Sequence, residues 1–365
     1  MPSPLEKYAH LLVNYCVSLQ KGERLLVQTS TLAAPLVREV YREALRAGGH
    51  PHVKFNFRDQ YKIGINEGEE HQLRYVDPIY ALAMEEFDAY IVIRAPFNNR
   101  SLHKIDAEKA KIAAQALRPY RKRYSERTAT LEMKRNLCEY PTLAHAQNAG
   151  MSLEQYEDFI FNACYLYDED PATRWRQLSV KQQRIVDLLN QKEKIRYKSP
   201  KMDITFSVKN RLWINSDGKT NMPSGEVYTS PVEDSVNGIV HFDYPSVYVG
   251  EEVEGITLWV KKGWIEKWEA RRGQTVLNRI FQIDGARRFG EVAIGTNARM
   301  QQPVRNILFD EKIGGTIHMA IGQAYLQTGG KNNSTIHWDM IADMKNGGKI
   351  YADEELIYED GFFIF

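Results

Sequence analysis

The hydrophobic pattern of this 365-residue chain changes near residue 190, and this change constrains the fold more than any other feature. Before it, segments with apolar residues spaced three and four apart alternate with short, apolar runs such as residues 24–29 and 89–94. Such runs are typical of strands buried on both faces, and their alternation with helices favours a mostly parallel sheet. We therefore expect an α/β fold for the N-terminal part.

After residue 190 the chain consists of short alternating runs, such as residues 203–208 and 349–352, separated by Asn, Asp, Gly and Pro. This pattern is typical of antiparallel strands joined by tight turns. A chain of this length is also too long for one compact core. We predict an N-terminal α/β domain (1–190) that ends in an almost wholly helical segment from about residue 106, and a C-terminal β-rich domain (191–365).

Composition excludes several classes of function. The formal net charge is only +1, from 48 basic and 47 acidic residues, which argues against nucleic acid as a partner. No run of 18 apolar residues predicts a membrane span, and no GxGxxG or GxxxxGK motif follows a predicted strand, so we expect no nucleotide cofactor. Cys16, Cys138 and Cys164 are odd in number and widely spaced, which favours buried thiols and a reduced cytoplasm.

Candidate metal ligands lie in the predicted C-terminal domain. His337 and Asp339 are two residues apart, so an extended segment would point both to one side, with Trp338 on the other. His318 lies in an alternating run that resembles a strand. Glu226 and Glu291 each directly follow a glycine and precede small or β-branched residues, as expected for a carboxylate at the beginning of a strand.

Each of these residues also has a structural interpretation. His318 alone would more often be a hydrogen-bonded core residue, and His337 with Asp339 could form an ordinary imidazole–carboxylate hydrogen bond. Imidazole and carboxylate groups are, however, the ligands that borderline divalent ions prefer. Two imidazoles, three carboxylates and the phenol of Tyr325 exceed the needs of one tetrahedral ion and fit two ions that share a bridging carboxylate and a water.

The order of these residues resembles a known ligand set, that of the aminopeptidase T and aminopeptidase S family of metallopeptidases. The matching positions are Glu226, Glu291, His318, Tyr325, His337 and Asp339. The surrounding phrases are similar too, at residues 222–231, 315–322 and 336–341. The resemblance is dense after residue 220 and loose before it.

The resemblance implies a homodimeric enzyme that releases N-terminal amino acids from peptide substrates by means of two divalent ions. Zinc or cobalt is expected, with manganese or magnesium as further candidates. Either Glu226 or Glu291 would bridge the ions, and Tyr325 would be a ligand or a donor to the developing oxyanion. Typical members are longer, whereas here His337 follows Tyr325 by only 12 residues. A shortened loop there would change access to the site without changing the ligands.

Two alternatives remain open at the level of sequence. His318, His337 and Asp339 form a two-histidine, one-carboxylate set that suits ferrous iron, and ring-opening dioxygenases of dihydroxypyridines resemble this peptidase family. That interpretation gives Glu226 and Glu291 no role. A binding protein with a purely structural metal is the other alternative, but structural zinc sites are rich in cysteine and no cysteine lies near these ligands.

Overall fold

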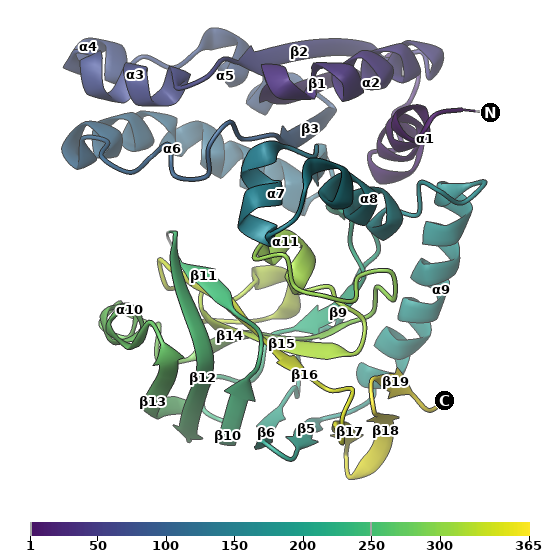
Figure 1. The fold of residues 1–365 in the computed structure, drawn as a ribbon, viewed down its shortest axis with the longest axis vertical. Coiled ribbons are helices and arrows are strands. Elements are labelled where there is room, and N and C mark those ends of the chain that lie inside the picture. Colours follow the sequence, from purple (N-terminus) through teal and green to yellow (C-terminus); the bar gives the residue numbers. More distant parts are fainter. Residues whose placement is uncertain (1, 249) are drawn as a thin grey trace. The chain divides into compact units, whose positions relative to one another are not determined.

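The computed structural model describes residues 2–248 and 250–365, and these form two compact units (Figure 1). The first unit comprises Met1–Ala172 and Gly218–Pro223, and the second comprises Thr173–Asp217 and Ser224–Phe365. The chain therefore returns briefly to the first unit after it has entered the second.

The first unit is built on a parallel sheet. In the described part of the chain its strand order is β2-β1-β3-β4-β8, and each of these neighbours pairs in parallel. The strands are β1 (Arg24–Ser30), β2 (His50–Asn56), β3 (Ala89–Arg94), β4 (Lys134–Glu139) and β8 (Asn221–Met222). Leu25, Leu26 and Val27 are buried, as the uniformly apolar run predicts. The predicted α/β fold is confirmed.

Helices connect the parallel strands of this unit, and their ends follow from the sequence. They are α1 (Pro4–His10), a π-helix (Leu11–Cys16), a 3-10 turn (Thr31–Ala33), α2 (Ala34–Arg46), α3 (Gln60–Glu67), α4 (Glu70–Leu73), α5 (Pro78–Glu86), α6 (Ala107–Ala129), α7 (Leu143–Ala149) and α8 (Leu153–Ala163). Asp77 caps α5 by accepting a hydrogen bond from the Ile79 amide, and Ser152 forms a capping box with Gln155.

The expectation of an almost wholly helical segment from about residue 106 to residue 190 was wrong, because strand β4 lies within it. β4 begins with two charged residues, Lys134 and Arg135, which hide its apolar character in the sequence. It buries Asn136, Cys138 and Glu139 beside β3. Pairing with a distant strand, and not local propensity, decides the structure of this segment.

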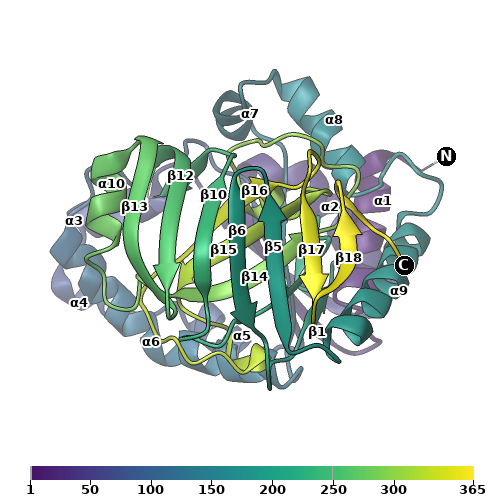
Figure 2. The ribbon, with the colours of Figure 1, turned by 90° about the horizontal axis from the view of Figure 1, so that it is seen from below.

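The second unit contains two antiparallel sheets. The larger one, sheet B, has the order β11-β12-β10-β6-β5-β17-β18-β19, with β13 beside β12, in the described part of the chain. Figure 2 shows its strands side by side from β13 to β18. They are β5 (Lys194–Ser199), β6 (Met202–Ser207), β10 (Asn237–Phe242), β11 (Ser246–Tyr248), β12 (Glu251–Lys261), β13 (Trp264–Arg272), β17 (Lys349–Ala352), β18 (Glu355–Glu359) and β19 (Phe362–Phe363).

The smaller sheet, sheet C, carries the candidate ligands. Its order is β16-β15-β14-β9-β7 among the described residues. The strands are β7 (Ile214–Ser216), β9 (Glu226–Thr229), β14 (Phe289–Gly295), β15 (Thr316–Gly322) and β16 (His337–Asp343). The helical elements of this unit are α9 (Pro171–Leu189), which begins in the first unit, α10 (Gln274–Ile280), α11 (Ile307–Asp310) and a 3-10 turn, η3 (Leu326–Thr328).

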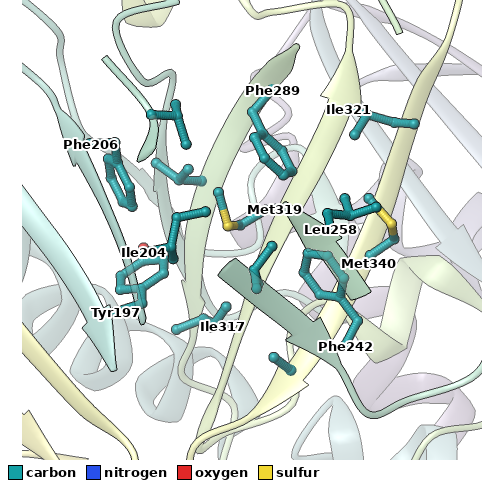
Figure 3. Packing of buried hydrophobic residues seen from close by; sticks show 14 of the residues in the cluster. Tyr197, Ile204, Phe206, Phe242, Leu258, Phe289, Ile317, Met319, Ile321 and Met340 are labelled. Carbon is teal, nitrogen blue, oxygen red and sulfur yellow. The ribbon is translucent and has the colours of Figure 1, made fainter. Parts of the chain in front are cut away.

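The two sheets pack against each other through a single apolar cluster (Figure 3). Ile317, Met319 and Ile321 of β15 point into this core and meet residues of sheet B such as Ile204 and Phe206. Because side chains alternate along a strand, the intervening residues of β15 point to the opposite face of sheet C. His318 is one of these residues, so the apolar core fixes the face on which the candidate ligands lie.

The last residues of the chain do not form a core strand. Phe362 is 75% exposed and Phe365 is 59% exposed, although β19 pairs with β18. Phe363, between them, is partly buried and packs against the apolar core of the second unit. Within residues 2–248 and 250–365, no helix is both long and apolar enough to span a bilayer.

Candidate metal centre

Four neighbouring strands of sheet C contribute the candidate ligands to one face. In an antiparallel sheet, residues directly opposite each other share a face. The pairs Glu291 with Ala320, Asp339 with Ala320 and His318 with Ala293 are of this kind. The ligand face thus carries Glu226 (β9), Glu291 (β14), His318 (β15), and His337 and Asp339 (β16).

Two glycines allow the glutamates to take these positions. Gly225 has φ +115°, and a Cβ there would lie 2.8 Å from the Asn297 Cβ. At Gly290, where the register between β14 and β15 shifts, a Cβ would lie 2.3 Å from the Gln323 carbonyl oxygen. This β-bulge turns Glu291 to the face opposite Phe289, although residues two apart normally share a face. Glu291 depends on the bulge to reach the other ligands.

The two imidazoles converge on the carboxylates. His318 Nε2 lies 3.4 Å from Glu226 Oε2, 3.6 Å from Glu291 Oε1 and 4.0 Å from Asp339 Oδ1. His337 Nε2 lies 3.1 Å from Glu291 Oε2 and 3.5 Å from Asp339 Oδ2. Glu291 therefore presents one oxygen to each imidazole.

These atoms form overlapping groups that could each hold a metal ion. Glu226, Glu291 and His318 form one group, and Glu291, His337 and Asp339 form a second. In a third, Glu311 joins His318 and Asp339, and in every group the ligand atoms lie within 4.8 Å of one another. Glu311 was not predicted from the sequence, because it lies in an Asp-Glu-Lys triplet at the end of α11 that is typical of a charged surface.

The hydrogen bonding of these side chains is consistent with a site for a divalent ion. Glu226 Oε2, both ring nitrogens of His318 and Asp339 Oδ1 are buried and have no hydrogen-bond partner within residues 2–248 and 250–365. Buried polar atoms are costly when unpaired, and imidazole nitrogen with carboxylate oxygen suits zinc, cobalt or manganese. His337 Nδ1 donates to the Gln323 carbonyl at 2.8 Å, which leaves Nε2 as the candidate ligand atom.

The electrostatics of the centre favour protonated histidines when no ion is bound. Burial opposes the charged form of His337, but Asp339 and Glu291 outweigh it and raise the pKa of His337 to about 12. For His318, burial is likewise outweighed by Glu291 and Glu226, which raise its pKa to about 9. Burial of Asp339 is outweighed by His337, which lowers the pKa of Asp339 to about 2. Metal binding must therefore displace protons from both imidazoles.

We expect the metal-free protein to lose stability as pH rises from 6.5 to 9. The pKa values of His318 and His337 rise on folding from their ordinary 6.5 to about 9 and about 12. The stabilising contribution of each is complete below 6.5 and declines as pH rises, and that of His318 disappears through 9. The loss should be about 3 kcal/mol or more. Denaturant unfolding of metal-free protein at both pH values measures it. Metal-loaded protein is the control, and a metal-free protein that becomes more stable over this range would contradict the assignment.

Tyr325 lies beside the ligand cluster on the turn that precedes η3. Its ring centroid is 5.1 Å from that of His337 and 5.5 Å from that of Tyr228. The side chain is 39% exposed, in contrast to the buried carboxylates, so it borders both the ligands and the solvent. Burial of the phenol, together with Glu291 and Asp339, raises the pKa of Tyr325, which keeps the hydroxyl protonated and able to donate.

Buried hydroxyl groups connect the Tyr325 turn to the bulge that carries Glu291. Ser230 Oγ donates to the Gly290 carbonyl at 2.6 Å and lies 2.7 Å from Thr328 Oγ1. Thr328 Oγ1 in turn donates to the Tyr325 carbonyl at 2.7 Å. Ser230 and Thr328 are buried, so this chain of contacts fixes the turn relative to β14.

The profile of the thermophilic metalloprotease family, M29, matches residues 2–363. The chain belongs to this family. The metalloprotease is 32% identical to Aminopeptidase 2 of Geobacillus stearothermophilus, with 92% of this chain and 91% of the relative covered. It is 26% identical to Aminopeptidase T of Thermus thermophilus, with 98% and 95% covered.

A solved structure gives the same fold. Wild-type AmpT from Thermus thermophilus superposes on the M29 chain with a TM-score of 0.82 and 23% sequence identity, and 99% of each chain is covered. The predicted family, the predicted α/β fold and the predicted class of metal-dependent aminopeptidase are thus confirmed. The alternative of a ferrous ring-opening dioxygenase is wrong, because the family match and these relatives are peptidases.

The structure brings all six residues singled out in the sequence into one region. Glu226, Glu291, His318, His337 and Asp339 share a face, and Tyr325 borders it. Trp338 packs into the core on the other face, as its position between two ligands predicts. The arrangement offers overlapping groups of candidate ligand atoms, and it places a carboxylate oxygen near each imidazole.

Proposed function

We propose that this M29 aminopeptidase works with two divalent ions bridged by Glu291. The observation that carries the proposal is the position of the Glu291 carboxylate, whose oxygens lie 3.6 Å from His318 Nε2 and 3.1 Å from His337 Nε2. One ion would be held by Glu226, Glu291 and His318, and the other by Glu291, His337 and Asp339. A carboxylate shared between two groups suits a bridge better than a terminal ligand.

Bound ions of this kind supply a water that loses its proton near neutral pH and a Lewis acid that polarises the scissile carbonyl. The protein's own residues orient the reaction. His337 is held by the Gln323 carbonyl, which fixes the direction of Nε2 toward the centre. Tyr325 would donate its hydroxyl hydrogen to the oxyanion that develops on the substrate.

Release of single N-terminal amino acids would follow from the free amine of the substrate. Because Glu226, Glu291 and Asp339 would already hold the ions, the amine would bind in its neutral form as a ligand of an ion. An internal peptide bond offers no such amine. We further infer a homodimer, zinc or cobalt as the ions, and a reduced cytoplasm, with the buried Cys16, Cys138 and Cys164 in support of the last.

Metal analysis tests the two-ion proposal. Protein purified without added metal and then saturated with cobalt or zinc should contain two ions per chain and hydrolyse leucine p-nitroanilide. Removal of the ions with a chelator should abolish turnover, and addition of cobalt or zinc should restore it. A saturated content of one ion per chain with full activity would contradict the bridged centre, because Glu291 would then have nothing to bridge.

A further inference from the structure

Lys312 places a fully buried ammonium group at the edge of the candidate centre. Its side chain is 0% exposed, and Nζ lies 3.5 Å from Glu226 Oε1. The ammonium also contacts the carboxylate of its neighbour Glu311. In the described part of the chain, these two carboxylates are the ones within ion-pair distance of Lys312. Both belong to candidate metal groups.

The backbone holds this lysine in place. The Lys312 amide donates to the Phe309 carbonyl at 2.9 Å, and its carbonyl accepts from the Asn297 amide at 3.0 Å. Burial of an ammonium group is costly unless carboxylates pair with it. Its charge is therefore a fixed part of the centre, and its complete burial prevents contact with a substrate.

Lys312 acts unequally on the two proposed ion positions. Glu226 directs Oε1 toward the ammonium and Oε2 toward His318, so it divides its charge between Lys312 and one ion position. Glu291, His337 and Asp339, which form the other position, make no ion pair with Lys312 among residues 2–248 and 250–365, although Asp339 interacts with its charge over a longer distance. A cation near one position disfavours a second cation there through Coulomb repulsion and through competition for the shared carboxylate.

We propose that the positive charge of Lys312 lowers the affinity for the ion held by Glu226 and His318. The ion at Glu291, His337 and Asp339 therefore binds first. This inference rests on the proposed two-ion centre. It assigns Lys312 a positioning role in metal loading, and not a role in contact with substrate or reacting atoms.

Cobalt titration of the metal-free protein tests the proposal. Calorimetry together with the visible absorption of bound cobalt should resolve a tight and a weak ion in the unaltered protein. In Lys312→Met the weak ion should bind about ten-fold more tightly or better, because the competing charge is gone, while the tight ion changes little. Lys312→Arg keeps the charge and should restore the separation of the two affinities. Lys349→Met is the matched control, since Lys349 pairs with Glu359 at 2.8 Å outside the candidate groups.

The outcomes separate this inference from the two-ion proposal. Two ions in every variant, with the weak affinity unchanged or reduced in Lys312→Met, would overturn the role of Lys312 alone. One ion in the unaltered protein and two in Lys312→Met would overturn the two-ion centre of the unaltered protein, while supporting the effect of Lys312 on the second ion. One ion in both would overturn both proposals. If Lys312→Met does not fold without metal, judged by circular dichroism, Lys312→Gln keeps a donor for the same carboxylates and serves as the neutral variant.

Discussion

Replacement of Glu291 by glutamine should lower kcat/KM by about 10³-fold or more and remove bound metal from the centre. The amide keeps the size of the side chain but loses the negative charge and one of the two acceptor oxygens. Oε1 lies 3.6 Å from His318 Nε2 and Oε2 lies 3.1 Å from His337 Nε2, so the change affects both proposed ion positions. Elemental analysis and leucine p-nitroanilide hydrolysis, measured on the same preparation, check this result.

Two further variants test whether the loss of both ions is specific to the replacement of Glu291. Glu226→Gln should also abolish turnover but should retain the ion held by Glu291, His337 and Asp339, because Glu226 belongs to only one of the two proposed positions. Glu359→Gln should change neither metal content nor activity, since Glu359 pairs with Lys349 in sheet B. Full metal content in Glu291→Gln would show that Glu291 is not the bridge.

Replacement of Tyr325 by phenylalanine should lower kcat by about 10²-fold and leave the metal content unchanged. The ring would keep its contacts with His337 and Tyr228, whose centroids lie 5.1 and 5.5 Å away, and only the hydroxyl would be lost. A hydroxyl that acts only on the developing oxyanion affects kcat and leaves KM nearly constant.

The matched control is Tyr228→Phe, which removes a hydroxyl from the ring next to Tyr325. Its hydroxyl accepts a hydrogen bond from Gln327 at 3.2 Å, so this variant should lose little activity. Loss of an ion in Tyr325→Phe would instead identify the phenol as a ligand. Unaltered kcat would contradict both roles.

The sequence could predict much of the centre because local rules determine it. His337 and Asp339 share a face through the alternation of a strand, and Trp338 enters the core for the same reason. Gly225 and Gly290 lie at close backbone contacts that no other residue tolerates. In the sequence, a glycine directly before Glu226 and Glu291 distinguished these two residues from ordinary surface carboxylates. The βα alternation before residue 190 likewise follows from periodicity and predicted the parallel sheet correctly.

Other features depend on contacts between distant segments, which periodicity does not encode. β4 begins with charged residues, and its pairing with β3 makes it a strand. The face of Glu291 depends on a bulge whose position is set by the register between β14 and β15.

The sequence by itself determined the residue types and order of the candidate ligands, and the family to which they point. Only the tertiary structure decided that Glu311 and Lys312 belong to the same centre, and that the ammonium of Lys312 lies 3.5 Å from Glu226. The physical reason is that a charged triplet after a short helix looks the same in sequence whether solvent or protein surrounds it. Its energetics change only when burial removes the water and leaves the carboxylates as partners.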